Sequence, residues 1–142
     1  MWAAEHSTTT TADAGALWER WTNPECWPEQ DRGTEWARLD GPLAVGTRIR
    51  LKPSGSVETS TTITTLEPFG RFTSESKIPF GKMTFDHLAT RDGATILFTH
   101  RITITGPLTP VFRRLFADEM ARSLPEMMES VARHAEGANV GR

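Results

Sequence analysis

Two histidines carry the chemistry that this sequence could perform. His87 and His100 lie in segments that alternate between apolar and polar residues, which is typical of half-buried strands. Imidazole titrates near neutral pH, so either ring could donate a proton to a ligand carbonyl or accept one, and both are candidate catalytic residues. The other interpretation is a pair of core histidines that hydrogen-bond to Ser74 or to the backbone. The sequence leaves both interpretations open.

Short turns predict how the strands around these histidines pair. A two-residue turn at Asp92-Gly93 places His87 opposite Phe98 and makes the two histidines diagonal neighbours. A second turn at Phe80-Gly81 places Ser74 opposite His87. A slip by one residue would move every side chain to the other face, so the contrast in polarity between the two faces supports this assignment of faces.

One face of the predicted sheet mixes apolar and polar side chains. It collects Thr61, Ile63, Phe72, Ser74, Ser76, Met83, Phe85, His87, Phe98, His100 and Ile102, whereas the opposite face collects charged residues and threonines. An apolar wall with a few convergent polar groups is typical of a ligand pocket. Within this face, the residues that we expect to bind a ligand are Thr61, Ile63, Ser74, Ser76, Phe85, His87, Phe98 and His100.

The end of the chain has the period of a long amphipathic helix. After Thr109-Pro110, which caps and starts the helix, apolar residues recur at spacings of three and four over about seven turns. Phe116, Met120 and Met127 of this helix would close the pocket, and such side chains make a wall that adapts to varied ligands. Gly137 is predicted to end the helix, and residues 137–142 to form a short flexible tail.

Two tryptophans and one arginine are further candidates for the pocket. Trp27 lies beside Pro28 near the expected mouth, where it either forms the rim or packs against the core. Trp36 could enter the pocket or cover its end, because its strand does not show which face points inward. Arg38 in the same strand would anchor a carboxylate or enolate oxygen if it points inward, and is otherwise a solvated surface arginine.

Composition and motifs exclude several classes of function. Lys plus Arg number 16 and Asp plus Glu 18, which gives a net charge of −2 and argues against a dedicated nucleic-acid binder. A metal site would need a third ligand beside the histidines, and Asp86 is predicted on the other face. The glycines form no phosphate-binding loop, so we expect neither a metal nor a cofactor.

Length and cysteine content bound the organisation of the chain. Its 142 residues suit one domain, and the single cysteine, Cys26, excludes an internal disulfide. A lone cysteine fits the reducing cytoplasm, where we expect the protein to be. No apolar run approaches the ~18 residues of a membrane-spanning helix, and residues 1–6 do not resemble a signal peptide. We therefore expect no integral membrane association.

The order of the predicted elements indicates an α+β fold. Residues 2–10 form the first strand, and two short helices follow, over residues 12–21 and from Asn23-Pro24. Six strands between residues 34 and 106 are separated by short segments rich in Gly, Pro, Ser and Asp, so successive strands are antiparallel neighbours. A curved seven-stranded sheet wrapped round the long C-terminal helix buries the apolar faces of both.

Short motifs spread over most of the chain carry a resemblance to a known superfamily. They are Trp27-Pro28-Glu29, Leu39-Asp40-Gly41-Pro42-Leu43 with Gly46-Thr47-Arg48, Phe85-Asp86-His87, Thr99-His100-Arg101 and Thr105-Gly106-Pro107-Leu108. With the order of elements, they resemble the START-like (SRPBCC) superfamily and its helix-grip fold, and within it the polyketide cyclase/dehydrase group. The resemblance covers residues 2–136. It implies one START-like domain over residues 1–136, with a cavity between sheet and helix that holds a small, largely apolar molecule.

The resemblance allows three functions. The first is binding of a small hydrophobic or amphipathic molecule in the cavity. The second is catalysis of the cyclase/dehydrase type, with His87 as the base and His100 or Ser74 as the donor to an enolate oxygen; the chain contains no tyrosine for the acid role. The third is protein interaction of the co-chaperone or toxin-like kind, through a cationic stripe of Arg48, Arg50 and Lys52. The sequence predicts neither the identity of the ligand nor the oligomeric state.

Overall fold

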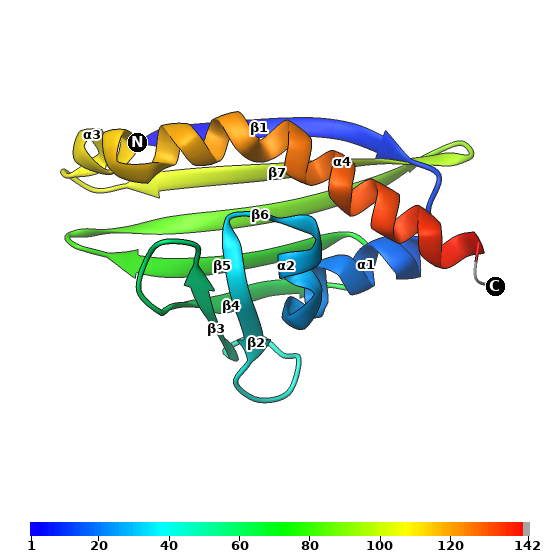
Figure 1. Ribbon diagram of the computed structural model, residues 1–142, viewed down its shortest axis with the longest axis horizontal. Coiled ribbons are helices and arrows are strands. Elements are labelled where there is room, and N and C mark those ends of the chain that lie inside the picture. The colour runs from blue at the N-terminus through cyan, green and yellow to red at the C-terminus, as the bar shows by residue number, and fades with distance from the viewer. Residues whose placement is uncertain (141–142) are drawn as a thin grey trace.

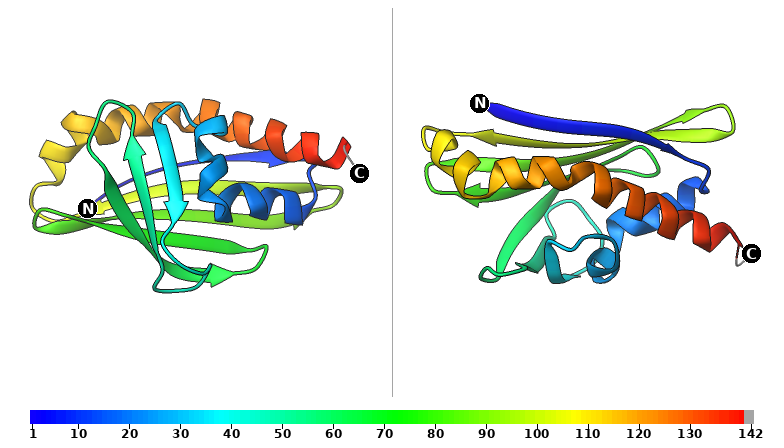
Figure 2. Two further views of the ribbon diagram at one scale, coloured as in Figure 1. Left: turned by 60° about the horizontal axis from the view of Figure 1, so that its bottom comes forward. Right: turned by 45° about the horizontal axis from the view of Figure 1, so that its top comes forward.

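Seven antiparallel strands form one curved sheet in the computed structural model, which describes residues 1–140 and the side chains of residues 1–138. The strands are β1 (Trp2–Thr10), β2 (Thr34–Leu39), β3 (Arg48–Pro53), β4 (Thr59–Glu67), β5 (Arg71–Ile78), β6 (Gly81–Asp92) and β7 (Thr95–Thr105). Their order in the sheet is β1-β7-β6-β5-β4-β3-β2, so the first strand pairs with the last (Figure 1). The sheet is strongly twisted, and β2 and β3 cross the direction of the other strands (Figure 2).

Short helices follow β1, and a long helical segment follows β7. Between β1 and β2 lie α1 (Ala14–Thr22), η1 (Pro24–Cys26) and α2 (Trp27–Gln30), and after β7 come α3 (Thr109–Phe112), η2 (Arg113–Ala117) and α4 (Asp118–Val140). α4 packs against β1, β7, α1 and α2 (Figure 1). This is the helix-grip architecture that the sequence predicts. Among the described residues, no helix combines the length and the apolar character that crossing a membrane requires.

The last helix departs from its expected course at two places. Gly137 does not end α4, because its backbone stays helical instead of adopting the left-handed conformation that terminates many helices. The helix continues to Val140, and residues 141–142 of the expected tail lie outside the described residues. η2 is a π-helical turn, which the ordinary helix formers of its sequence do not signal. Glu136 Oε2 accepts a hydrogen bond of 2.6 Å from Thr10 Oγ1, which ties the end of α4 to β1.

The turn between β6 and β7 lies one residue later than the sequence predicts. It consists of Gly93-Ala94. Gly93 occupies the first turn position with a φ of 65°, and a type II′ turn favours glycine there because the position requires a positive φ. His87 therefore pairs directly with His100, and the predicted pairing of His87 with Phe98 is wrong.

The turn between β5 and β6, Pro79-Phe80, lies one residue earlier than predicted. Pro79 suits the first central position of a type II turn, and Phe80 takes the second with a φ of 60°. Ser74 therefore pairs with Phe85, and the predicted pairing of Ser74 with His87 is wrong. Both errors shift the register by two residues, so each side chain stays on its predicted face. All residues of the predicted mixed face are buried or half-buried.

Apolar side chains form two main clusters between the sheet and the helices. The closed cluster, which α1 covers, has a buried centre of Leu17, Trp21, Ile49, Ile63, Phe72, Ile96, Phe98, Met128, Val131 and Ala132. The open cluster, at the end of the sheet nearest α3, has a smaller buried centre of Met83, Ile102, Ile104, Ala117 and Leu124. Half-buried side chains surround that centre: Trp2, Ile78, Phe85, Phe112, Phe116, Met120 and Met127. The open cluster therefore keeps apolar surface accessible.

Candidate functional site

Four polar side chains form a diagonal line across the concave face of the sheet. They are Thr61 on β4, Ser74 on β5, His87 on β6 and His100 on β7. Strand pairing places Thr61 and His87 diagonally to either side of Ser74. His87 and His100 pair directly. The fold thus brings together, as a polar diagonal, residues that the sequence predicts on one face.

A tryptophan of α1 holds His100 in place. The Trp21 indole donates from Nε1 to His100 Nε2 over 3.1 Å, and both side chains are almost fully buried. Since Nε2 accepts this bond, the ring proton lies on Nδ1. Burial lowers the pKa of His100 well below its usual range, and the nearby His87 and His6 act in the same direction. His100 is therefore neutral at physiological pH.

His87 lies against His100 in an edge-to-face arrangement, with 4.5 Å between the ring centres. Its Nδ1 donates to the carbonyl oxygen of Phe72 over 3.1 Å, which leaves the lone pair of Nε2 as the acceptor. Burial lowers the pKa of His87 to about 4, although the Phe72 carbonyl and Asp86 act in the opposite direction. The ring is neutral at physiological pH and half-buried, so Nε2 can accept a hydrogen bond from a bound molecule.

A third histidine completes this row and is absent from the sequence-based prediction. His6 on β1 pairs with His100, so β1, β7 and β6 carry histidines side by side. Alternation along β1 indicates that His6 points inward, but its neighbours become visible only once β1 pairs with the last strand. Within residues 1–138, no three His, Cys, Asp or Glu side chains are placed to hold a metal ion.

The hydroxyl of Thr61 is buried without a hydrogen-bond partner. Thr61 is 4% exposed, and its Oγ1 is the one buried side-chain nitrogen or oxygen of the described residues that has no partner. Burying such an atom without a partner lowers the stability of the fold by roughly 1–3 kcal/mol, because the atom gives up its hydrogen bonds to water. Ser76, also predicted in the site, donates instead from its Oγ to the carbonyl oxygen of Ser60 over 2.9 Å. Because its Oγ1 is enclosed, a bound molecule reaches the Thr61 hydroxyl only where neighbouring side chains move aside.

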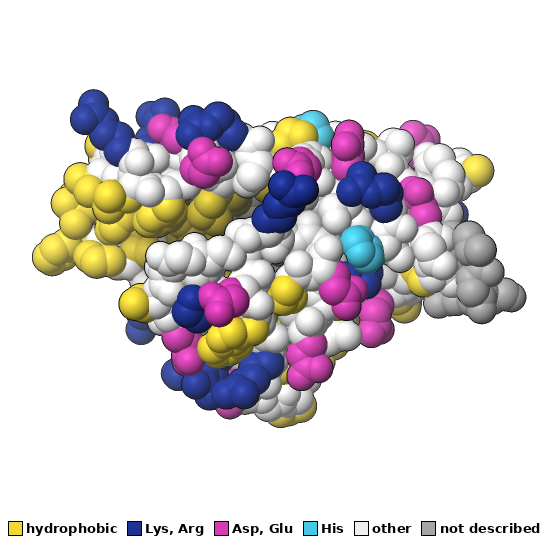
Figure 3. Space-filling model, viewed as in Figure 1, with side chains coloured by type: hydrophobic (Ala, Val, Ile, Leu, Met, Phe, Trp, Pro, Cys, Tyr) yellow, Lys and Arg dark blue, Asp and Glu magenta, His cyan; other side chains and the backbone are white. Residues whose placement is uncertain are grey.

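Apolar side chains of the sheet and of the last helix flank the polar diagonal. Phe85 pairs with Ser74 and belongs to the open cluster, as do Phe116, Met120 and Met127. These four apolar side chains are half-buried, so each keeps accessible surface. Figure 3 shows hydrophobic side chains gathered between the helix and the strands, at the end of the molecule that carries α3. The polar diagonal is therefore bordered on one side by accessible apolar surface.

Three other predicted site residues lie in or against the closed cluster. Phe98 and Ile63 are almost inaccessible there. Trp27 packs against the same cluster, and its Nε1 donates to the carbonyl oxygen of Trp21 over 3.2 Å. Phe98 lies against the His100 ring, with 5.7 Å between the ring centres, and Trp27 is tied to the backbone of Trp21.

Trp36 and Arg38 lie on the solvent side of β2. Ala37 is buried and Leu39 packs against the closed cluster, so the alternating residues of the strand face outward. The Arg38 guanidinium lies 5.4 Å from the centre of the Trp36 ring, which makes a cation–π contact on that outer face. The structure therefore does not bring either side chain to the polar diagonal.

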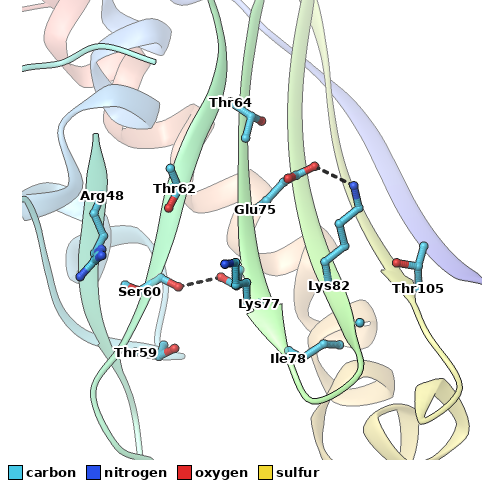
Figure 4. Close-up of a pocket in the computed structure, with 12 residues that line it drawn as sticks. Arg48, Thr59, Ser60, Thr62, Thr64, Glu75, Lys77, Ile78, Lys82 and Thr105 are labelled. Atoms are coloured by element: carbon cyan, nitrogen blue, oxygen red, sulfur yellow. Dashed lines mark hydrogen bonds and ion pairs between the residues drawn. The ribbon is translucent and has the colours of Figure 1, made fainter. Parts of the chain in front are cut away.

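A hollow of about 870 Å³ lies on the opposite, solvent-facing side of the sheet (Figure 4). Polar side chains of β3 to β7 line it, among them Arg48, Thr62, Glu75, Lys77, Lys82 and Thr105. The rest of the cationic stripe is paired with acids: Arg50 lies 2.8 Å from Glu58, and Lys52 forms an ion pair with Glu35. Two of the three cations of the stripe are thus paired with acids, and Arg48 lines the hollow.

Comparisons with known proteins give matches in structure but not in sequence. No family model matches the chain, and no curated protein matches it. A START superfamily protein from Mycobacterium smegmatis superposes with a TM-score of 0.73 at 12% identity, over 92% of this chain and 97% of the other. Norcoclaurine synthase from Thalictrum flavum, solved with dopamine and hydroxybenzaldehyde, superposes with a TM-score of 0.68 at 14% identity, over 93% and 84%.

The third comparison is with a two-domain protein. The ARO/CYC protein BexL from the BE-7585A biosynthetic pathway superposes with a TM-score of 0.72 at 16% identity. The match covers 96% of this chain and 47% of BexL, so this chain spans about half of that protein. Likeness at such identities shows the fold and not the activity. The chain has the START-like (SRPBCC) fold, as its motifs and its order of elements predict.

Proposed function

We propose that this protein binds a small, largely apolar molecule that carries a carbonyl or hydroxyl group, against the concave face beside α4. The observation that carries the proposal is the unpartnered Oγ1 of Thr61 on the same face as Ser74 and His87. A buried hydroxyl that only destabilises the fold would be expensive to keep, whereas a ligand that hydrogen-bonds to it removes the cost.

The flanking residues suit such a ligand. The open cluster offers Phe85, Phe116, Met120 and Met127 as an apolar wall, and methionines adapt to varied shapes. The neutral Nε2 of His87 accepts a hydrogen bond from a ligand hydroxyl, and the hydroxyl of Thr61 donates to a ligand carbonyl. An apolar wall with a few fixed polar groups is the usual composition of a small-molecule site.

The pKa of His87 favours binding over a reaction of the cyclase/dehydrase type. In that reaction His87 would remove a proton next to a ketone. A base with a pKa of about 4 holds a proton weakly at neutral pH. The variant His87→Gln separates the two functions: for a binding protein it weakens ligand affinity, and for an enzyme it removes turnover while affinity stays.

Mass spectrometry of the native protein tests the proposal. We expect the purified protein, or the protein incubated with a panel of small aromatic ketones and phenols, to carry one adduct that is lost on denaturation. A protein that stays bare with every member of the panel contradicts the proposal. For its cellular location we infer the cytoplasm, with the buried free thiol of Cys26 as support.

Replacing Thr61 with valine should raise stability and lower ligand affinity together. Valine has nearly the shape of threonine and removes the unpartnered hydroxyl, so the free energy of unfolding should rise by about 1 kcal/mol. The ligand loses one hydrogen bond, so its affinity should fall about tenfold. Urea denaturation and titration calorimetry measure the two effects.

The neighbouring residue supplies the control for this variant. Thr62 faces the solvent-side hollow, so Thr62→Val should leave ligand affinity unchanged. A loss of stability in Thr61→Val would contradict the unpartnered state of the hydroxyl. An unchanged affinity for a bound ligand would show that the hydroxyl does not serve the ligand.

A further inference from the structure

The tripeptide Pro-Phe-Gly occurs at both ends of β5, and its two phenylalanines differ in their surroundings. Phe69 and Phe80 both have a positive φ, of 65° and 60°, a backbone conformation that bulky residues rarely adopt. Phe69, before β5, packs its ring against Trp18 at 6.0 Å. Phe80, after β5, is 81% exposed and has no aromatic contact with any described residue. The fold therefore gives Phe69 a partner and leaves Phe80 directed at the solvent.

Phe80 shares its end of the molecule with other exposed apolar side chains. The β5–β6 turn packs against the loop that joins β7 to the last helical segment, because a Cβ added at Gly106 would lie 2.6 Å from the Phe80 carbonyl oxygen. On that segment, Val111 and Leu115 are 49% and 70% exposed, and their spacing of four residues places them on one helical face. Behind them the half-buried aromatics of the open cluster continue the apolar surface (Figure 3).

Cationic side chains lie on both segments that carry these apolar residues. Arg113 and Arg114 lie on η2 beside Leu115, and Lys77 and Lys82 flank the β5–β6 turn. Two acids partly balance them: Arg113 lies 3.4 Å from Asp118, and Lys82 lies 3.2 Å from Glu75. Lys77 and Arg114 form no ion pair with a described residue. Figure 4 shows Lys77 and Lys82 among the residues that line the solvent-side hollow, with Lys82 extended toward Glu75.

We propose that this α3 end, formed by Phe80, Val111 and Leu115 with Lys77 and Arg114, docks on the surface of membranes that contain anionic lipids. Phenylalanine and leucine enter the boundary between headgroups and acyl chains, while lysine and arginine remain with the anionic headgroups. The excess of cations complements a negatively charged surface. This docking goes beyond the proposed function and does not require that the concave face bind a ligand.

A second copy of the chain fits the α3 end less well. A two-fold dimer through this end would place the same cations opposite one another, and the repulsion would oppose association. Lysine is also depleted from the cores of protein interfaces, whereas it is common at membrane surfaces. The apolar side chains project from the β5–β6 turn and from the last helical segment, and the hollow on that segment is lined instead by Pro110, Arg113, Arg114 and Asp118.

Sedimentation with vesicles tests the proposal on the full chain. We expect binding to vesicles of phosphatidylcholine with phosphatidylglycerol, weaker binding in high salt, and little binding to phosphatidylcholine alone. Phe80→Asn and Leu115→Gln should each weaken binding about tenfold, because each removes an inserted apolar side chain. Asparagine tolerates a positive φ, so the turn should keep its conformation. Lys77→Gln with Arg114→Gln should abolish the preference for the anionic vesicles.

The other Pro-Phe-Gly turn supplies a matched control. Phe69→Asn makes the same change at the other turn residue with a positive φ. This residue lies at the opposite end of β5, about 26 Å away at ~3.3 Å per residue, so the variant should leave vesicle binding unchanged. Circular dichroism checks that each variant is folded. Leu115→Gln, at an exposed helical position, carries the test if Phe80→Asn does not fold.

Three outcomes overturn the proposal. One is no binding to either kind of vesicle. Another is binding that Phe80→Asn and Leu115→Gln leave intact or that Phe69→Asn weakens equally. The last is a dimer in sedimentation equilibrium that Phe80→Asn dissociates, without vesicle binding, which would assign the α3 end to a second copy. None of these outcomes bears on ligand binding at the concave face, which is measured separately.

Discussion

Acidification from pH 6.5 to pH 4 should destabilise this protein by about 3 kcal/mol through His87 alone. The pKa of His87 falls from 6.5 in the unfolded chain to about 4 in the fold, where burial disfavours the charged ring. The unfolded state therefore binds more protons over this window. The free energy of unfolding is highest above pH 6.5, where the ring is neutral in both states, and it falls as the pH drops toward 4. His100, whose pKa is also lowered, adds to the loss.

Urea denaturation at a series of pH values measures this effect. His87→Gln removes the titrating ring and should flatten the pH dependence, while its amide can still donate to the Phe72 carbonyl. His134 is exposed on α4, so His134→Gln should keep the full dependence and serves as the control. If wild type and His87→Gln lose stability in parallel between pH 6.5 and 4, His87 is not held neutral by burial.

Trp21→Ala should cost roughly 3–5 kcal/mol, a large share of the stability of a domain of this size. Trp21 is 2% exposed and packs its ring against Phe98 and His87, at 6.4 and 5.4 Å between ring centres. Its indole is also the donor to His100 Nε2, so truncation leaves a cavity and a buried acceptor without a partner. The histidine pair should lose its fixed geometry along with the stability.

A second variant of Trp21 separates packing from hydrogen bonding, and a variant of Trp36 serves as a control on the outer face. Trp21→Phe keeps most of the ring and removes the N–H, so it should cost only about 1–3 kcal/mol. Trp36→Ala, on the outer face of β2, should cost about 1 kcal/mol or less. Chemical denaturation of the three variants measures the order. Equal losses for Trp21→Ala and Trp36→Ala would contradict the buried role of Trp21.

Alternation along a strand predicts well which face each side chain occupies, because side chains two residues apart share a face. A register error of two residues keeps His87, His100 and Ser74 on one face, and this is why the mixed face could be predicted although two of its pairings were wrong. The exact pairing depends on which residue of a turn takes the positive φ. At the β6–β7 turn Gly93 takes the first position, and the sequence alone allows either position.

Other features of the site depend on contacts between distant elements, which local patterns do not contain. The helical spacing of Trp21 indicates a core residue, but its hydrogen bond to His100 joins residues that are 79 positions apart. The orientation of Trp36 is settled by a register shift in the pairing of β2 with β3, between Thr34 and Trp36, which no sequence signal marks. The unpartnered state of Thr61 depends on every neighbour around its hydroxyl and becomes visible only in the complete fold.

The pairing of β1 with β7 sets the order in which this chain can fold. β2 to β7 pair with their neighbours in sequence and can assemble as they are synthesised, through short loops that close quickly. β1 has to wait for a partner at the far end of the sheet: Ser7 and Thr99, whose hydroxyls hydrogen-bond, are 92 positions apart. Until then the edge of β7 and the apolar side of the last helix remain uncovered. The closing of this pair should therefore be the slow step of folding, and the intermediate before it the species most prone to aggregate.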